Sequence, residues 1–368
     1  MIEKGKISAF QLAIMMFPTI VGTAIIGVPT VTGKFAKNDL WLSPIWASIT
    51  GVVAVYIAFQ LHKFYPKQTI IQYSEQIAGR FVGKILGLLF LFFYILMNGQ
   101  SIRIYADFIV GATLYNTPIS IVIATMILIC TFATRAGLEV LGRMGQLFFP
   151  VFTFPLIIMI IFLIPDLDVR NIFPIMEHGL LPSIKGAYVP QAWFAEFFLI
   201  SFLIPFVTDK DKGLKWMGIS IFSVMISFVI VNLLILFFIG EIGAKDNNYP
   251  LLMAARYIGV AGFFENLESV AISVWVLGNF VKFSAVHYCI VLGTAQWLNL
   301  SDYRPIVFPL GMLTMVFSFW GMPSQIDIIH YLVLTGFPLY SLLIQTIIPL
   351  LLLGIAIVRK GKMKKRET

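Results

Sequence analysis

The sequence predicts an all-α polytopic membrane protein, with about ten transmembrane helices arranged as a five-plus-five inverted repeat. Of its 368 residues, 59% are hydrophobic and only 12% are charged, whereas soluble domains carry about 25% charged residues. The apolar residues gather in long runs separated by short polar segments. A water-soluble fold could not hide that much apolar surface, but a lipid bilayer accepts it.

A hydropathy window of about 19 residues divides the chain into ten candidate spans. Several of them exceed the ~20 residues that a helix needs to cross the membrane, so tilted or broken helices are expected. The predicted spans are 8–33, 41–63, 81–111, 119–135, 139–164, 188–208, 213–240, 264–294, 305–321 and 330–358.

Basic residues predict the orientation of these spans. An even number of spans places both termini on one side, and the positive-inside rule makes the more basic side cytoplasmic. On the side of the termini lie Lys4, Lys6, Lys63, Lys67, Arg80, Lys84, Arg135, Arg143, Lys210, Lys212, Lys215, Arg304 and the basic tail of 359–368. The other side holds only Lys34, Lys37, Arg170, Lys185, Lys245 and Arg256. The net charge of +8 therefore indicates a cytoplasmic flank and not a nucleic-acid-binding surface.

Two halves of the chain resemble each other. The long third and eighth spans each follow a short segment that opens with Tyr-Pro (Tyr65 and Tyr249) and closes with Ala-Gly. Five spans per half is an odd number, so the second half must be inverted relative to the first. We expect a single membrane domain with one repeat over about 1–165, a second over about 186–358, and a cytoplasmic tail at 359–368.

In inverted-repeat transporters the ligand lies at mid-membrane, where the first helix of each repeat is broken. The first span contains Gly22, Gly27 and Pro29, all of which weaken a helix. We expect this stretch to unwind and to present free N–H groups to an anionic ligand group; the alternative is a kinked helix with small residues for close packing. The sixth span, with Glu196 and Pro205, suggests a weaker break. The predicted ligand-binding residues are Gly22, Thr23, Ala24, Ile25, Gly27, Glu196, Phe198, Leu199, Ser201 and Phe202.

Three further charges fall inside predicted spans. Arg103 and Asp107 are spaced i, i+4 and share a helix face, so they either pair with each other or leave Arg103 to line a pathway. Lys282 lies in the eighth span, where a buried ammonium could exchange a proton or take the place of a transported sodium ion. We assign these three residues a coupling role as a hypothesis.

Nothing in the sequence supports enzymatic chemistry. His287 is the only histidine deep in a span, and a hydrogen-bonded core residue is the favoured interpretation. An acyltransferase using His287 would need a second polar partner, and no carboxylate shares its helix face. No metal-ligand spacing, phosphate loop or dinucleotide fingerprint occurs, so no cofactor is expected.

The chain resembles the B subunits of spore germinant receptors, a family similar to the amino acid–polyamine–organocation transporters with their LeuT-like fold. The residues that carry the resemblance are Ile7-Ser8-x-x-Gln11, Gly22-Thr23-x-Ile25, Pro29, Asp39-x-Trp41-Leu42-Ser43, Tyr249-Pro250-Leu251-Leu252, Arg256-x-Ile258, Leu267-Glu268, Trp275, Phe280-x-Lys282 and Glu196 with Pro205. Two positions depart from the pattern: Ala195 replaces an expected glycine, which would narrow the pocket, and Asn266 replaces an expected arginine.

This resemblance implies a receptor more than a nutrient carrier. Members of the family sense a germinant such as an amino acid, a sugar or a nucleoside in the inner membrane of the spore. They act beside A and C subunits and are linked to ion release. The apolar residues predicted at the pocket suggest a neutral amino acid as the ligand. The competing interpretation on the same fold is a proton-coupled amino acid transporter.

Overall fold

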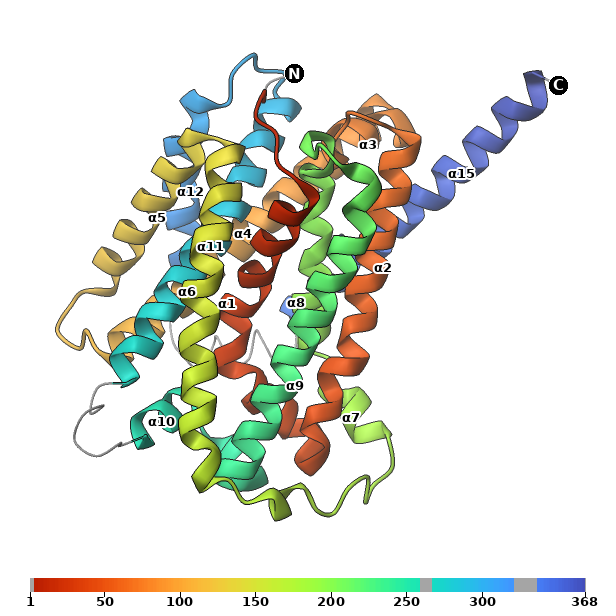
Figure 1. Cartoon of the computed structure of the whole chain (residues 1–368). Helices are drawn as coiled ribbons and strands as arrows, with labels where there is room; N and C mark the ends of the chain where they lie inside the picture. The colour runs from red at the N-terminus through yellow and green to blue at the C-terminus, as the bar shows by residue number, and fades with distance from the viewer. Residues whose placement is uncertain (1–2, 259–266, 321–335, 368) are drawn as a thin grey trace.

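The computed structural model describes residues 3–258, 267–320 and 336–367 as a bundle of long, apolar helices (Figure 1). The helices of the first half are α1 (Ala9–Ala36), α2 (Ser43–Phe64), α3 (Ile70–Ala78), α4 (Arg80–Ala112), α5 (Ile119–Ala136) and α6 (Leu138–Leu163). Those of the second half are α7 (Leu181–Gly186), α8 (Pro190–Ala195), α9 (Gly213–Asp246), α10 (Pro250–Tyr257), α11 (Leu267–Trp297), α12 (Val307–Phe319), α14 (Phe337–Leu342) and α15 (Ile348–Glu367).

Shorter helical turns connect or interrupt these helices. They are the 3₁₀ turns η1 (Lys37–Leu42), η2 (Ile164–Asp166), η3 (Val169–Ile172), η4 (Glu196–Phe202), η5 (Ile204–Phe206), η6 (Lys210–Lys212) and η7 (Arg304–Ile306), and the π-helical turn η9 (Leu343–Ile347). Within the described residues the only strand-like pairing is a parallel bridge between Ile7 and Val207.

Seven described stretches are long and apolar enough to cross a membrane. The first of them, Ala9–Phe64, contains both α1 and α2. The predicted spans at 188–208 and 305–321 correspond to the interrupted segment α8–η5 and to the shorter α12. Parts of the predicted spans 264–294, 305–321 and 330–358 lie outside the described residues, but each of the ten predictions falls on an observed helical segment.

The two halves repeat the same order of elements. In each half a short helix that follows a Tyr-Pro pair, α3 or α10, precedes a long helix, α4 or α11. Figure 1 shows α3 and α10 at opposite ends of the bundle. An inverted repeat requires this placement, because equivalent elements then face opposite sides of the membrane.

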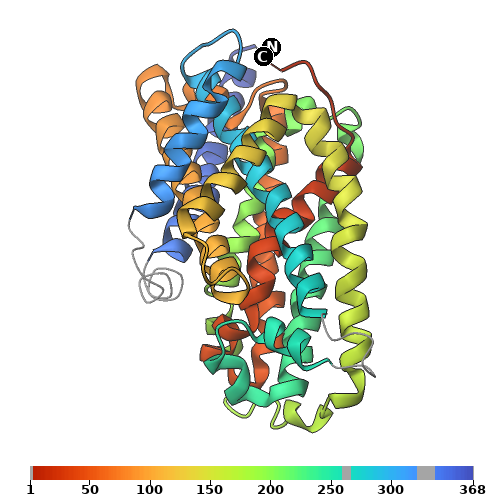
Figure 2. The ribbon, with the colours of Figure 1, turned by 90° about the vertical axis from the view of Figure 1, so that its left-hand side faces the viewer.

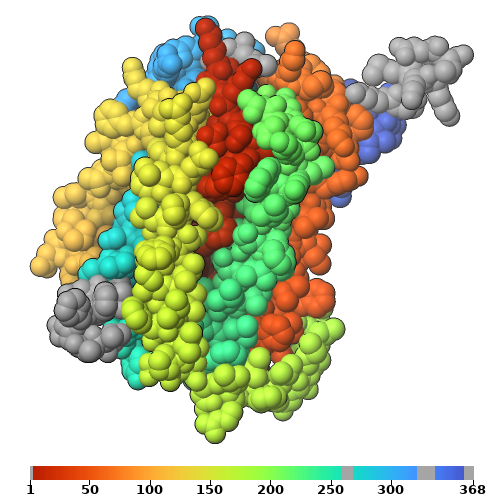
Figure 3. All heavy atoms as spheres, viewed as in Figure 1, coloured from red at the N-terminus to blue at the C-terminus, as the bar shows by residue number. Residues whose placement is uncertain are grey.

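Helix α1 forms the centre of the bundle and packs against α9, α11 and α6. Most of its residues are buried, and Figure 3 shows it as a narrow red strip between α6 and α9. A capping box begins the helix: the Gln11 N–H donates to Ser8 Oγ over 3.1 Å, and the Ser8 N–H donates to Gln11 Oε1 over 2.9 Å.

Residues 3–9, which we call the N-terminal strap, cross one end of the bundle and lead into α1, whose first residue is Ala9. The Glu3 carboxylate is buried and accepts hydrogen bonds from the hydroxyls of Tyr288 (2.9 Å) and Tyr303 (3.0 Å). Further along, the Ile7 N–H donates to the Phe206 carbonyl (3.2 Å), and the Ala9 N–H donates to Asp209 Oδ1 (2.7 Å). The strap therefore ties α11 to the segment after η5. It lies at the same end as the far part of α15 (Figure 2).

Candidate functional site

The sixth span is the broken helix. Helix α8 ends at Ala195, and the chain continues as 3₁₀ turns through Glu196–Phe202 and Ile204–Phe206. Pro205 has no N–H to donate to the turn before it, and the run of aromatic and β-branched residues around it favours the helix weakly. The sequence predicted that this break would be weaker than the one in the first span. That prediction is wrong, because the sixth span is interrupted whereas the first span is a continuous helix.

Helix α1, by contrast, is continuous through Gly22–Gly27, so the predicted unwinding there is wrong. Gly22 lies where α1 crosses α11: a Cβ added to it would stand 3.0 Å from the carbonyl carbon of Gly278. The amide of Asn279 also donates to the Gly22 carbonyl oxygen over 3.2 Å. Close packing and side-chain donors from neighbouring helices satisfy this backbone and let the helix continue past its glycines and Pro29.

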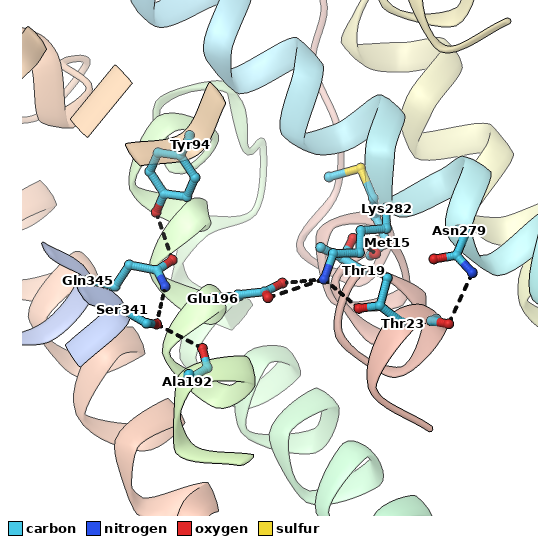
Figure 4. Close-up of polar contacts among 11 residues, drawn as sticks. Met15, Thr19, Thr23, Tyr94, Ala192, Glu196, Asn279, Lys282, Ser341 and Gln345 are labelled. Atoms are coloured by element: carbon cyan, nitrogen blue, oxygen red, sulfur yellow. Dashed lines mark hydrogen bonds and ion pairs between the residues drawn. The ribbon is translucent and has the colours of Figure 1, made fainter. Parts of the chain in front are cut away.

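A buried ion pair joins the broken segment to α11 and α1. Lys282 Nζ lies 2.8 Å from Glu196 Oε2 and 3.2 Å from Glu196 Oε1, and it donates to Thr23 Oγ1 over 2.8 Å (Figure 4). Both charged side chains are almost completely buried, at 1% and 2% exposure. Two full charges in so apolar an environment stabilise each other, but neither would be tolerated there alone.

A cavity of about 140 Å³ lies beside this ion pair. On α1 it is lined by Thr23, Gly27 and Thr30, which share one helix face. A Cβ added at Gly27 would meet nothing within 4 Å. The other polar residues that line the cavity are Lys34, Gln100, Ser101, Tyr105, Asp107, Glu196, Asn248, Tyr249 and Asn279.

The predicted ligand-binding residues separate into two groups. Thr23, Gly27 and Glu196 line the cavity. Gly22, Ala24, Ile25, Phe198, Leu199, Ser201 and Phe202 are buried and do not line it. Phe198 packs against Phe90 with ring centroids 6.2 Å apart, and Phe202 packs against Tyr94 at 5.6 Å. These two aromatic side chains therefore belong to the core behind the broken segment.

Several lining residues were not predicted from the sequence. Gln100, Ser101 and Tyr105 come from α4, Trp193 comes from α8, and Tyr249 stands just before α10. Gln100 stands seven residues, or two helical turns, before Asp107 on the same face of α4. A search for polar positions on that face, starting from Asp107, would have found Gln100.

Arg103 and Asp107 form the mutual ion pair that their spacing allowed, with Arg103 Nε 3.0 Å from Asp107 Oδ2. Asp107 lines the cavity, whereas Arg103 does not and lies over the ring of Phe319, 5.9 Å from its centroid. The interpretation that the pair neutralises both charges is confirmed.

A chain of buried hydrogen bonds reaches the broken segment from the side opposite Lys282 (Figure 4). The Tyr94 hydroxyl donates to Gln345 Oε1 over 3.1 Å, and Gln345 Nε2 donates to Ser341 Oγ over 2.7 Å. The Ser341 hydroxyl then donates to the carbonyl of Ala192 over 3.0 Å. Gln345 belongs to the π-helical turn η9, and such turns often occur at functional sites. Glu196 thus stands between two polar connections to distant helices.

The remaining predictions concern single residues. His287 is buried and its Nε2 lies 3.1 Å from the Val307 carbonyl oxygen, so its assignment as a hydrogen-bonded core residue is confirmed. Ala195 is fully buried at the end of α8 and does not line the cavity. Asn266 lies outside the described residues.

Comparison with known proteins gives a consistent result. Residues 6–326 match the family model described as "Spore germination protein". The chain is 23% identical to spore germination protein YndE of Bacillus subtilis (strain 168), over 87% of this chain and 88% of that protein. It is also 23% identical to spore germination protein KB of the same organism, over 99% of this chain and 98% of that protein.

Solved structures of transporters share the fold. The nucleobase-cation-symport-1 family transporter Mhp1, with bromovinylhydantoin bound, aligns with a TM-score of 0.67 at 13% identity, over 93% of this chain and 75% of Mhp1. MhsT in complex with L-phenylalanine aligns with a TM-score of 0.59 at 12% identity, over 96% of this chain and 99% of MhsT. The predicted five-plus-five LeuT-like fold is confirmed.

Proposed function

The chain belongs to the spore germination protein family, and from that premise we propose that it is the germinant-sensing subunit of a spore germination receptor. It binds a small neutral amino acid at mid-membrane, in the inner membrane of the spore with both termini cytoplasmic. Together with A and C subunits it triggers ion release. The observation that carries the proposal is the cavity beside the Glu196–Lys282 ion pair.

The size of the cavity favours an amino acid over the other germinant classes. Its volume of about 140 Å³ is close to that of an engineered cavity of ~150 Å³ that accommodates benzene. A ligand of roughly six to eight non-hydrogen atoms fits such a space, and a hexose or a nucleoside is larger. The two ion pairs near the cavity cancel their own charges, and the other charged lining residue, Lys34, is exposed to solvent, so a ligand without net charge suits the cavity best.

The ion pair offers a route from ligand to signal. Glu196 belongs to the broken segment, Lys282 to α11, and Thr23 to the face of α1 that lines the cavity. A ligand that contacts Thr23 and Glu196 alters the hydrogen bonds that these two residues make with Lys282. It thereby shifts the position of the broken segment relative to α1. A ligand that binds one arrangement better shifts the population toward it.

Ligand-dependent thermal stabilisation of the full chain in lipid nanodiscs tests the proposal. L-alanine or L-valine is expected to raise the midpoint of unfolding, since a ligand at 100 times its Kd stabilises by about 2.7 kcal/mol. Gly27→Leu, which would fill the cavity, should abolish the shift. Gly218→Leu, an exposed helical glycine with open space around it, should not. A shift with glucose or inosine and none with any amino acid would contradict the amino-acid assignment.

A proton-coupled amino acid transporter is the second candidate, favoured by the transporter fold and by a buried carboxylate that could carry a proton. Uptake of radiolabelled L-alanine into proteoliposomes separates the two. A receptor subunit alone should show binding without accumulation, whereas concentrative uptake driven by a proton gradient would favour the transporter.

A further inference from the structure

A groove of about 660 Å³ lies on the surface of the bundle, away from the cavity described above. Its walls come from the last turn of α1, the first two turns of α2, and the chain from α7 to the start of α8. The groove and the cavity share no lining residue. The groove is therefore a separate feature, and its chemistry must be considered independently.

Hydrogen bonds and close packing hold α7 against the start of α2. Ser43 Oγ donates to the Ser183 carbonyl over 2.9 Å, and Trp46 Nε1 donates to Ser183 Oγ over 3.2 Å. A Cβ added to Gly186 would stand 3.0 Å from the Ala36 Cβ, so a glycine here lets α7 approach the end of α1 closely. These contacts fix the walls of the groove.

The groove lies at the level where the membrane meets water. Helix α2 has 22 residues, so it is about 33 Å long at 1.5 Å per residue and matches a hydrocarbon core of ~30 Å. Trp46 is in the first turn of α2 and therefore lies near one edge of that core. Figure 1 shows α7 beside this end of α2, away from the two chain termini. Tryptophan and tyrosine side chains are enriched at this level, and Trp46 and Tyr188 both line the groove.

An apolar face of α2 continues from the groove toward the middle of the membrane. Ile45, Ile49 and Val52 are exposed, and their spacing of four and three residues places them on one face of the helix. Ile49 also lines the groove. A hydrocarbon chain that leaves the groove along α2 therefore meets apolar side chains.

Lys185 is the one charged residue among those that line the groove. It is exposed, and it forms no ion pair with a carboxylate in the described part of the chain. Three other basic residues predicted on the same side, Arg170, Lys245 and Arg256, each pair with an acidic side chain. The charge of Lys185 is thus available to an anion at the membrane surface.

We propose that this groove binds an anionic phospholipid, with the phosphate at Lys185 and one acyl chain along Trp46 and Ile49. The phosphate supplies the negative charge that Lys185 lacks in the protein and accepts hydrogen bonds from its ammonium. A free phosphate ion would leave the apolar wall uncovered, whereas a lipid covers it. Because the groove shares no residue with the cavity, the inference does not depend on the proposed function.

Lipid binding to the purified full chain tests the proposal. The protein in detergent is titrated with phosphatidylglycerol and with phosphatidylcholine of the same acyl chains, and bound lipid is counted by native mass spectrometry. Phosphatidylglycerol is expected to bind about 5-fold more tightly, as one lysine near an anionic lipid predicts. Equal binding of the two lipids would overturn the proposal. Displacement of the lipid by inorganic phosphate alone would also overturn it, since the acyl chain would then contribute nothing.

Two lysine variants localise the site. Lys185→Gln should make the affinities for the two lipids equal, and the fold should persist because the side chain is exposed. Lys37→Gln is the matched control, since Lys37 is also exposed, is predicted on the same side and does not line the groove; it should retain the preference. A preference that survives in Lys185→Gln, or that disappears in Lys37→Gln alone, would overturn the assignment.

A third variant tests the apolar wall. Thr50→Trp places a large ring in the groove and should weaken binding of phosphatidylglycerol, whereas unchanged binding would contradict the proposed path of the acyl chain. A helix of a partner subunit is the other possible occupant. Cross-linking of Thr50→Cys to a partner subunit, with no loss of lipid binding in Thr50→Trp, would assign the groove to that helix and overturn the lipid proposal.

Discussion

The ammonium group of Lys282 contacts two residues that come from different parts of the fold. Glu196 lies 86 positions away in the sequence and Thr23 lies 259 positions away. A lysine ammonium has three donors and no acceptor, so the three short contacts account for its bonding capacity. The residue is thus the polar junction of α1, α11 and the broken segment.

Truncation of Lys282 should be strongly destabilising. Lys282→Ala would leave the Glu196 carboxylate buried and unpaired, which costs about 3–5 kcal/mol. The double variant Lys282→Met with Glu196→Gln removes both charges and should recover most of that loss. Denaturation of the purified variants in detergent measures the difference. A Lys282→Ala protein as stable as the wild type would show that Glu196 is neutral or solvated.

At the scale of elements, Gly22 and Gly27 of α1 have different roles. Gly22 sits against the α11 backbone and Gly27 faces the cavity. Gly22→Ala should destabilise by about 1–3 kcal/mol through overpacking, because the obstructing atoms belong to backbone and cannot move aside. Gly27→Ala should preserve or raise stability, since alanine favours a helix by about 1 kcal/mol, but should weaken ligand binding.

Thermal unfolding and ligand titration of these two variants check the assignment. The expected pattern is a loss of stability confined to Gly22→Ala and a loss of affinity confined to Gly27→Ala. Destabilisation by Gly27→Ala, or unchanged affinity in it, would contradict the assignment of Gly27 to the cavity wall.

The N-terminal strap predicts a dependence on pH. Burial raises the pKa of the Glu3 carboxyl, but hydrogen bonds from Gly5, Tyr288, Tyr303 and Lys4 outweigh it and hold the pKa below its ordinary value. A lowered pKa in the folded state contributes stability above the unfolded-state value, and this contribution disappears as the pH falls through the folded-state pKa. Acidification below about pH 4 should therefore release the strap.

Glu3→Gln isolates this contribution. At pH 7 the variant should be less stable than the wild type by about 1–3 kcal/mol, and the difference should shrink as the pH falls below about 4. Glu139→Gln serves as the control, since the exposed Glu139 accepts a 3.2 Å bond from the Lys6 N–H of the same strap and otherwise makes only a solvent-exposed ion pair with Arg143 at 3.7 Å. A stability difference that stays constant down to about pH 3 would argue against ionised Glu3 as the attachment point.

At the scale of the whole molecule, the uneven distribution of basic residues predicts that both termini are cytoplasmic. The N-terminal strap and η6 lie at one end of the bundle, and the loop before α7 lies at the other (Figure 1). Both native cysteines are buried, so single exposed cysteines report topology cleanly. In intact cells a membrane-impermeant maleimide should label Glu177→Cys and spare Asp211→Cys. Labelling of Asp211→Cys alone would reverse the orientation.

Local sequence composition determined the helices and their order. The apolar runs placed α1, α2, α4, α5, α6, α9 and the interrupted sixth span, because burial in lipid depends on the residues of each segment alone. The spacing of Arg103 and Asp107 likewise specified their ion pair, since residues four apart share one face of a helix.

Only the tertiary structure decided which helix breaks and which side chains meet. Gly22, Gly27 and Pro29 predicted a break in α1, but packing against α11 and a donor from Asn279 preserve that helix. The partner of Lys282 and the position of Gln100 at the cavity also come from distant segments. The physical reason is that, in an apolar medium, every polar group must find a partner within the protein, and such partners are supplied by whichever helices pack alongside.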